Sequence, residues 1–190
     1  MLNNSTSTLV ANPIPTNRTF WDDLPEGGVI LDLIPENDPR LRQPSETYEF
    51  VSPAETNQLV LDMGATMRYN RGIGLSAVQF GLMKRVFVIE IGEDLPLALF
   101  NPIIVDQGPD VEMEEGCLSF PGLTVKVKRP EFVKVRFKNF NNEVITQRFE
   151  GLSARCILHE LDHLDGLVMK DRVTKLRYEQ ATKARKKRTR

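Results

Sequence analysis

The segment His159-Glu160-Leu161-Asp162-His163 constrains this chain more than any other feature. Residues four apart in a helix stand on the same face, one turn above each other, so both imidazoles can face one cation. Glu160 adds a carboxylate close enough to accept a proton from a water on that cation. Two neutral imidazoles and such a carboxylate are what a metal-dependent hydrolase needs. The pattern therefore predicts a helix that carries a metal site.

A short pattern of this kind also occurs by chance on solvated helices. Two features favour the metal site. The chain contains only two histidines, and both lie in this segment. Leu152, Cys156 and Ile157 precede them at a spacing that indicates a partly buried helix. We therefore interpret His159 and His163 as metal ligands.

A catalytic site of this kind needs a third protein ligand. Met169 stands where long zinc-hydrolase patterns carry another histidine, and Glu179 lies in a strongly basic stretch. Cys117 lies in residues 114–122, a predicted loop, where its thiolate could complete a Cys-His-His site with water in the fourth position. We interpret Cys156 as a small buried residue. Cys117 is the favoured third ligand.

Three segments, taken together, resemble the signatures of the peptide deformylase family and occur in the family's order. They are Gly72-Ile73-Gly74-Leu75-Ser76-Ala77-Val78-Gln79, Glu115-Gly116-Cys117-Leu118-Ser119 and His159-Glu160-Leu161-Asp162-His163-Leu164-Asp165-Gly166. Residues 34–42 also resemble the family's opening segment, and the likeness runs from about residue 30 to about residue 175. Each motif is weak or moderate alone, but the three together are highly specific.

The resemblance implies a reaction, a substrate and a metal. The reaction is hydrolysis of the N-formyl group from the first methionine of newly made peptides, which releases formate. Cys117, His159 and His163 would hold one divalent metal. In the family this metal is usually ferrous iron, with zinc, nickel or cobalt as substitutes. The Cys-His-His donor set by itself suits both zinc and iron.

The same resemblance assigns the residues around the metal. Glu160 would take the proton of the metal-bound water, and the Gln79 amide and the Leu118 N–H would stabilise the oxyanion. Glu115 and Asp162 either orient a ligand or are solvated carboxylates. The glycine-rich segment exposes backbone with which a peptide could pair like an added strand. The expected substrate-binding residues are Gly72, Ile73, Gly74, Glu115, Gly116, Leu152 and Arg155.

Several positions depart from the family pattern. Ser76 replaces the usual alanine, Val78 a frequent proline and Leu158 a common glutamine. None of these is expected to touch a ligand, the base or an oxyanion donor. Arg155 matters more, because many members carry an apolar residue of the methionine pocket there. Its side chain could narrow the pocket, reach a peptide carbonyl or point into solvent.

The hydrophobic pattern predicts an α+β fold: small antiparallel sheets packed around the central metal-binding helix, with a basic helix at the C-terminus. Ser52-Pro53-Ala54-Glu55 predicts a capped helix start, and Met63 and Met67 continue that helix as a buried stripe. Asn141-Asn142 predicts the turn of a hairpin. The predicted strands are 85–91, 97–105, 124–128, 131–140 and 143–149.

With 190 residues, of which 41% are hydrophobic, the chain can form one sizeable core. We expect a flexible arm over residues 1–28, a catalytic domain over 29–173 and a basic tail over 174–190. Its two cysteines fit a reducing compartment, and no apolar run approaches the roughly 20 residues of a membrane span. We expect a cytoplasmic monomer, with organellar targeting left open.

Charge is distributed unevenly along the chain. Residues 170–190 hold ten Lys or Arg against two acidic residues, a net charge of +8, whereas the rest of the chain carries −9. Such a tail could bind the phosphates of ribosomal RNA, although a solvated helix end has the same composition. Two other functions remain open at this point. One is a zinc endopeptidase that uses His159, His163 and Glu179. The other is an inactive deformylase-like protein that binds ribosomes.

Overall fold

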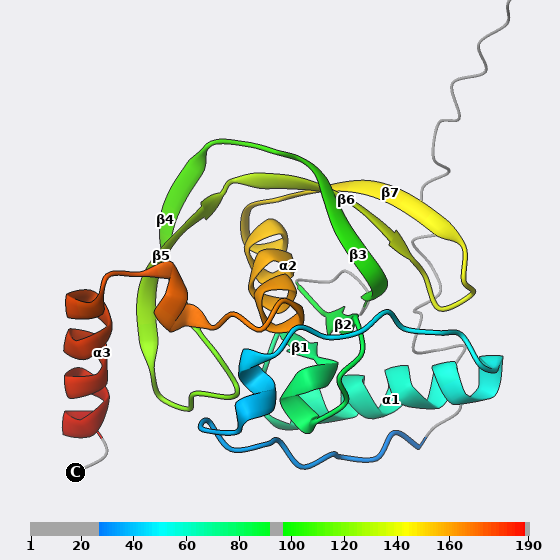
Figure 1. The fold of residues 1–190 in the computed structure, drawn as a ribbon, viewed down its shortest axis with the longest axis horizontal. Coiled ribbons are helices and arrows are strands. Elements are labelled where there is room, and N and C mark those ends of the chain that lie inside the picture. Colours follow the sequence, from blue (N-terminus) through cyan, green and yellow to red (C-terminus); the bar gives the residue numbers. More distant parts are fainter. Residues whose placement is uncertain (1–26, 92–96, 189–190) are drawn as a thin grey trace, which may run out of the picture.

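The computed structural model describes residues 27–91 and 97–188 (Figure 1). In this part of the chain, one antiparallel sheet has the strand order β1-β2-β3-β6-β7, and β4 and β5 form a separate two-stranded sheet. The strands are β1 Gly74–Ser76, β2 Val86–Ile89, β3 Leu97–Gln107, β4 Asp110–Gly116, β5 Thr124–Pro130, β6 Phe132–Lys138 and β7 Val144–Glu150. The helices are α1 Pro53–Tyr69, α2 Gly151–Leu164 and α3 Lys175–Arg188, with short 3-10 turns η1 Pro39–Arg42, η2 Ala77–Phe80 and η3 Met169–Arg172.

Helix α2 lies at the centre of the molecule, between the two sheets (Figure 1). Its apolar residues, among them Ile157 and Leu161, share a hydrophobic core with Phe87, Val135 and Phe149 from the large sheet. An apolar stripe on a helix of this length requires such a partner surface. The turn after α2 contains a glycine at φ 72° (residue 166), a conformation that favours glycine. The segment that the histidine pattern predicted as a helix is therefore largely buried.

Helix α1 begins as its sequence predicts. The Ser52 hydroxyl accepts a hydrogen bond from the backbone N–H of Glu55 at 3.2 Å, and Pro53 occupies the first turn. Met63 and Met67 are fully buried in a second core, on the other side of the large sheet from α2. The predicted methionine stripe is thus confirmed as core packing.

The predicted strands are confirmed, with small shifts of their ends. The hairpin of β6 and β7 pairs Phe137 with Ile145, and its turn holds Asn142 at φ 64°. The interpretation of residues 114–122 as a loop was partly wrong. Residues 114–116 complete β4, which pairs with β5 along its whole length.

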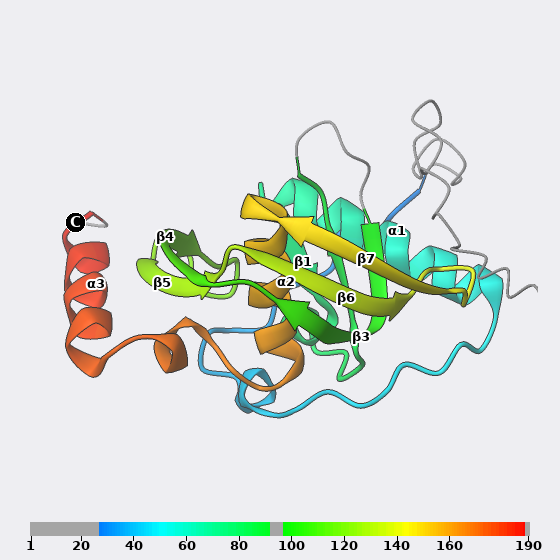
Figure 2. The same cartoon turned by 90° about the horizontal axis from the view of Figure 1, so that it is seen from above.

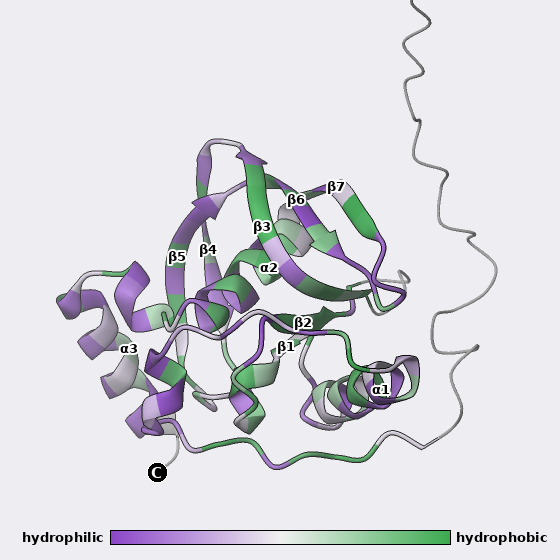
Figure 3. Ribbon diagram, turned by 45° about the vertical axis from the view of Figure 1, so that its right-hand side comes forward, coloured by the Kyte–Doolittle hydropathy of each residue, from purple (hydrophilic) through white to green (hydrophobic). Residues whose placement is uncertain are grey.

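Helix α3 lies at the end of the molecule beside β4 and β5 (Figure 2). Its residues are largely hydrophilic (Figure 3), but Tyr178 and Ala181 pack against the apolar residues of β5 and η3. The predicted arm over residues 1–28 lies almost entirely outside the described residues. Among the described helices, none is long and apolar enough to cross a membrane.

Candidate metal centre and cavity

Three side chains that can ligate a metal meet beside helix α2. One ligand atom each from Cys117, His159 and His163 lies within 4.8 Å of the others, and the Cys117 Sγ is 3.1 Å from the His163 Nε2. Tetrahedral ligation by one sulfur and two nitrogens places such atoms about 3.3–3.6 Å apart. The three donors therefore fit one divalent metal with only small adjustments.

The surroundings favour the thiolate form of Cys117. Burial raises the pKa of this thiol, but His163 and then His159 outweigh burial and bring the pKa well below its ordinary value. A thiolate between two imidazoles is the form that binds a metal. The Cys117 sulfur is therefore in the protonation form that a metal requires.

The second ring nitrogen of His159 is held by a carboxylate. The Nδ1 of His159 lies 3.1 Å from Glu115 Oε2, which fixes the ring so that its Nε2 is free for a metal. Glu115 is buried, and burial raises its pKa, but hydrogen bonds from His159 and Arg129 lower the pKa to about 2. Glu115 therefore stays ionised. The alternative of a solvated carboxylate is wrong for Glu115, and also for Asp162, which is buried between Arg129 and Arg172.

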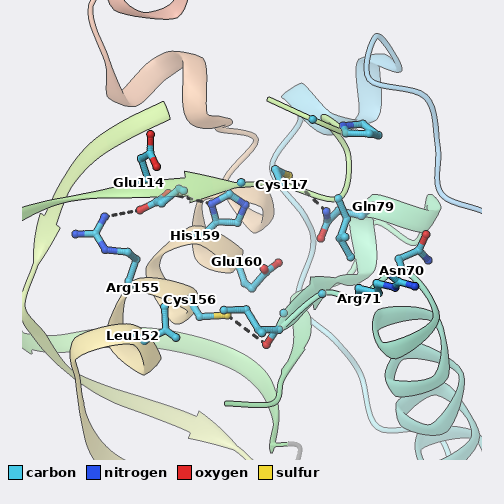
Figure 4. A pocket seen from close by; sticks show the side chains of 18 residues that line it. Asn70, Arg71, Gln79, Glu114, Cys117, Leu152, Arg155, Cys156, His159 and Glu160 are labelled. Atoms are coloured by element: carbon cyan, nitrogen blue, oxygen red, sulfur yellow. Dashed lines mark hydrogen bonds and ion pairs between the residues drawn. The ribbon is translucent and has the colours of Figure 1, made fainter. Parts of the chain in front are cut away.

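The centre opens into a cavity of about 510 Å³. Figure 4 shows Cys117, His159 and Glu160 together in this cavity, with Gln79 on one side and Arg155 on the other. Every residue expected to bind substrate lines this cavity, and so do the predicted catalytic residues. Of the three predicted metal ligands, Cys117 and His159 line the cavity and His163 does not. These lining residues are Gly72, Ile73, Gly74, Gln79, Glu115, Gly116, Cys117, Leu118, Leu152, Arg155, His159 and Glu160.

Glu160 is a buried carboxylate at the side of the cavity. Its Oε2 accepts a hydrogen bond of 2.8 Å from the Ser76 hydroxyl, which also donates to the Glu160 backbone carbonyl at 2.9 Å. Burial raises the pKa of Glu160, so its carboxylate is a better proton acceptor than an exposed one. A Cβ on Gly74 would lie 2.5 Å from Glu160 Oε1, so the missing side chain of Gly74 leaves room for the carboxylate.

Two hydrogen-bond donors stand beside the sulfur of Cys117. Gln79 is held in one orientation because its Oε1 accepts from the Ser76 N–H at 2.8 Å. Its Nε2 donates to Ser119 Oγ at 3.0 Å and lies 3.7 Å from Cys117 Sγ. The N–H of Leu118 has no hydrogen-bond acceptor among the residues that the structure describes. Both groups are in place to donate to an oxygen near the sulfur.

Two residues differ from the expectations drawn from the sequence. Ser76 was not expected to touch the base, but it donates directly to Glu160; the expectation was wrong because this contact joins residues 84 apart in the chain. Arg155 does not point into solvent, since it is only 3% exposed, and it pairs with Glu115 at 2.6 Å. Cys156 is buried as expected, and its thiol donates to the Ile73 carbonyl at 3.5 Å.

The sequence interpretation missed Arg129. This side chain donates to both oxygens of Glu115, at 2.6 and 2.9 Å, and to Asp162 at 2.8 Å. A signal for it exists in the sequence, because Arg129 continues the inward-facing alternation of Val125 and Val127 along β5. A charged residue at an inward strand position indicates a buried ion pair. The cavity also includes Asn70, Arg71, Glu114, Pro121, Gly122 and Cys156, which were not assigned to it.

The third ligand of the endopeptidase alternative does not lie near this centre. Glu179 is on α3, half exposed, and faces Lys175 at 4.0 Å. Within the described residues, the group that can hold a metal consists of Cys117, His159 and His163. Cys117, and not Glu179, therefore lies with the two histidines, and the endopeptidase is not favoured.

Comparison with known proteins gives a consistent result. The family model described as polypeptide deformylase matches residues 30–179. The chain is 41% identical over 143 residues to the peptide deformylase of Wolbachia pipientis subsp. Culex pipiens, a match that covers 68% of this chain and 80% of the relative. It is 40% identical over 150 residues to the peptide deformylase of Neisseria gonorrhoeae, covering 78% of this chain and 89% of the relative.

Solved structures agree with these matches. The peptide deformylase of Synechococcus elongatus, crystallised in complex with actinonin, is 39% identical with a TM-score of 0.76, covering 82% of this chain and 86% of that one. The peptide deformylase of Legionella pneumophila is 34% identical with a TM-score of 0.78, covering 85% of this chain and 96% of that one.

Proposed function

The chain belongs to the peptide deformylase family, and from that premise we propose which of its residues carry out the reaction. It is a metal-dependent hydrolase that removes the N-formyl group from the N-terminal formylmethionine of newly made peptides. The carbonyl to be attacked is that of the formamide, and the products are formate and a free amino group. The cavity residues divide into metal ligands, a base, oxyanion donors and peptide-binding backbone.

Cys117, His159 and His163 are the proposed metal ligands. Their donor atoms converge within 4.8 Å, and the low pKa of the thiol supports ligation as thiolate. When bound there, a divalent cation supplies Lewis acidity and makes water a nucleophile near neutral pH. We propose ferrous iron as the native metal because it is the usual metal of the family. Zinc, nickel and cobalt are the proposed substitutes, since a thiolate with two imidazoles suits all four.

Glu160 is the proposed general base. Its carboxylate accepts the proton of the attacking water and then delivers it to the nitrogen of the departing amine. Burial supports this role, because it raises the pKa of Glu160 toward the pH at which the enzyme works. Ser76 holds one carboxylate oxygen, which leaves the other free to accept the proton.

Gln79 and Leu118 are the proposed oxyanion donors. The Gln79 Nε2 and the Leu118 N–H lie on the side of Cys117, where the formyl oxygen acquires negative charge during attack. Both are fixed before the reaction, Gln79 by Ser76 and Leu118 by its backbone position after Cys117. Donors held in advance stabilise developing charge without a cost of reorganisation.

The peptide is proposed to bind along β1, which is an edge strand of the large sheet. Gly72, Ile73 and Gly74 line the cavity, and the two glycines carry no side chain that would block an added strand. The first side chain of the peptide would then enter the cavity toward α2, where Leu152 supplies an apolar wall. Glu115, Gly116 and Arg155 complete the proposed binding set.

One observation carries the proposal: three atoms that can ligate a metal and a buried carboxylate meet beside a cavity whose lining includes Gly74 of the edge strand β1. The test is formate release from formyl-Met-Ala-Ser by protein purified without oxygen and loaded with Fe(II). Rapid turnover is expected. A protein with one bound metal per chain that releases no formate would contradict the proposed site.

Gln79→Glu is expected to lower kcat by more than about a hundredfold while changing KM little, because a negative charge replaces one oxyanion donor. Glutamate keeps the oxygen that accepts from the Ser76 N–H, so the local turn is preserved. The measurement is steady-state kinetics with metal content determined for both proteins. A loss confined to KM would show that Gln79 binds substrate in the ground state instead.

We also propose that residues 29–173 form the catalytic domain of a cytoplasmic monomer, and that the basic tail, residues 174–190, contacts ribosomal RNA. Lys183 and Lys187 are exposed on α3, a surface suited to phosphate contacts. Lys183→Glu with Lys187→Glu should reduce co-sedimentation with ribosomes and lower the slope of log binding against log salt by about two. Hydrolysis of formyl-Met-Ala-Ser should not change. Unaltered co-sedimentation would exclude this contact.

A further inference from the structure

The proposed metal ligands come from two parts of the fold. Cys117 directly follows β4 in the two-stranded sheet, whereas His159 and His163 lie on α2. In the described part of the chain, β4 and β5 pair only with each other. A two-stranded hairpin is marginally stable alone, so its position depends on what it packs against. Whatever fixes this hairpin on α2 therefore also sets the distance from the sulfur to the two imidazoles.

Two arginines cross between the hairpin and the helix in opposite directions. Arg129, from β5, donates to the Leu158 carbonyl at 3.2 Å and to Asp162 at 2.8 Å, both on α2. Arg155, from α2, donates to the carbonyl of Val111 on β4 at 2.7 Å and to that of Val127 on β5 at 3.0 Å. One guanidinium thus binds both strands of the hairpin, as its fixed fork of donors allows.

Both arginines meet at the carboxylate that orients His159. Glu115 Oε1 accepts a hydrogen bond of 2.6 Å from Arg129 and another of 2.6 Å from Arg155. The side chains of all three residues are only 4% exposed. A buried charge of this kind is retained only with close partners, and breaking such a pair is costly. The contacts of Arg155 therefore couple the hairpin, the carboxylate and the helix at one point.

We propose that Arg155 is a positioning residue that docks the β4–β5 hairpin on α2 and so holds Cys117 at ligating distance from His159 and His163. The inference rests on the proposed metal site. It gives Arg155 a role beyond lining the cavity, because its two Nη groups bind the hairpin and Glu115. Removing the Arg155 side chain leaves Glu115 paired with Arg129. The carbonyls of Val111 and Val127, however, lose their hydrogen bonds from Arg155.

The test uses the cobalt-substituted protein, with variants Arg155→Met, which keeps much of the length and removes the donors, and Arg155→Lys, which keeps the charge without the fork. The dissociation constant for Co(II) is measured by competition with a chelator, and the thiolate-to-cobalt charge-transfer band reports the Cys117 bond. Arg155→Met should weaken Co(II) binding about 10- to 100-fold and reduce the band. Arg155→Lys should recover part of both.

Arg68→Met is the matched control, because Arg68 also forms a two-point pair with a carboxylate, Glu90, but at the surface and away from the hairpin. Its Co(II) affinity and band should equal those of the parent. The proposal is overturned if Arg155→Met keeps the parent's affinity and band, or if Arg68→Met weakens binding equally. If Arg155→Met does not fold, the proposal is overturned by an Arg155→Lys variant that keeps the parent's Co(II) affinity and band. Failure of the proposed site itself would appear separately, as a parent protein that lacks the thiolate band.

Discussion

Glu160→Gln should lower formate release from formyl-Met-Ala-Ser by about a thousandfold, within the range of 10²–10⁴ that a positioned acid–base group contributes. Glutamine has nearly the same shape as glutamate and can still accept the hydrogen bond from Ser76. It cannot take a proton from water at neutral pH. The loss should therefore lie in kcat, with the fold and the three proposed ligands unchanged.

The measurement is kcat and KM for the parent and the variant, each with its iron content determined. Equal metal content is essential, since Glu160 lies next to a proposed ligand in the chain. Circular dichroism and thermal unfolding check that the buried amide is tolerated. A variant that binds metal normally and keeps more than about a tenth of the activity would remove Glu160 from the role of general base.

Cys117→Ser should reduce formate release to the background rate and weaken binding of Co(II) by more than about a hundredfold. Loss of a residue that only orients a ligand already lowers metal affinity about 10- to 100-fold, and loss of a direct ligand lowers it more. A serine hydroxyl is hard and is not ionised at neutral pH, so it replaces a soft thiolate poorly. The thiolate-to-cobalt band should disappear.

The chain supplies its own control, because its other cysteine is buried two helical turns from His163. Cys156→Ala should keep one Co(II) per chain and the thiolate band, since the Cys156 sulfur donates to the Ile73 carbonyl and lies outside the metal-binding group. If Cys117→Ser retains the band and the metal, the third ligand is another residue. The same result would favour a hydrolase in which an acidic residue is the third metal ligand.

Several elements could be predicted because their signals are local. The Ser52 cap, the proline after it and the Met63–Met67 spacing lie within a few turns of one helix, and they define α1. The alternation in β6 and β7 and the Asn141-Asn142 turn define a hairpin for the same reason. Strand β4 was missed because only Glu115 of its residues is buried, so the strand shows no hydrophobic alternation.

For the candidate site, too, some features could be predicted from the sequence and others could not. The sequence determined that His159 and His163 share a helix face and that Glu160 lies beside them, because a spacing of four residues fixes this geometry in any helix. The motif order also identified Cys117 and Gln79 as the residues to join them. The proposed reacting groups can therefore be identified from short segments of the sequence, each taken by itself.

Only the tertiary structure decided how these segments are held together. Arg129 and Arg155 meet at Glu115, and Ser76 meets Glu160, across 14 to 84 residues of chain. No periodicity links such positions. The contacts of Arg155 and Ser76 depend on how the hairpin and the edge strand pack on α2, and the Arg129–Glu115 pair joins the two strands of the hairpin. Burial then makes these polar contacts necessary, because a charge without a partner inside a protein is strongly destabilising. The sequence determined which groups could react, and the packing around α2 decided which charges hold them in place.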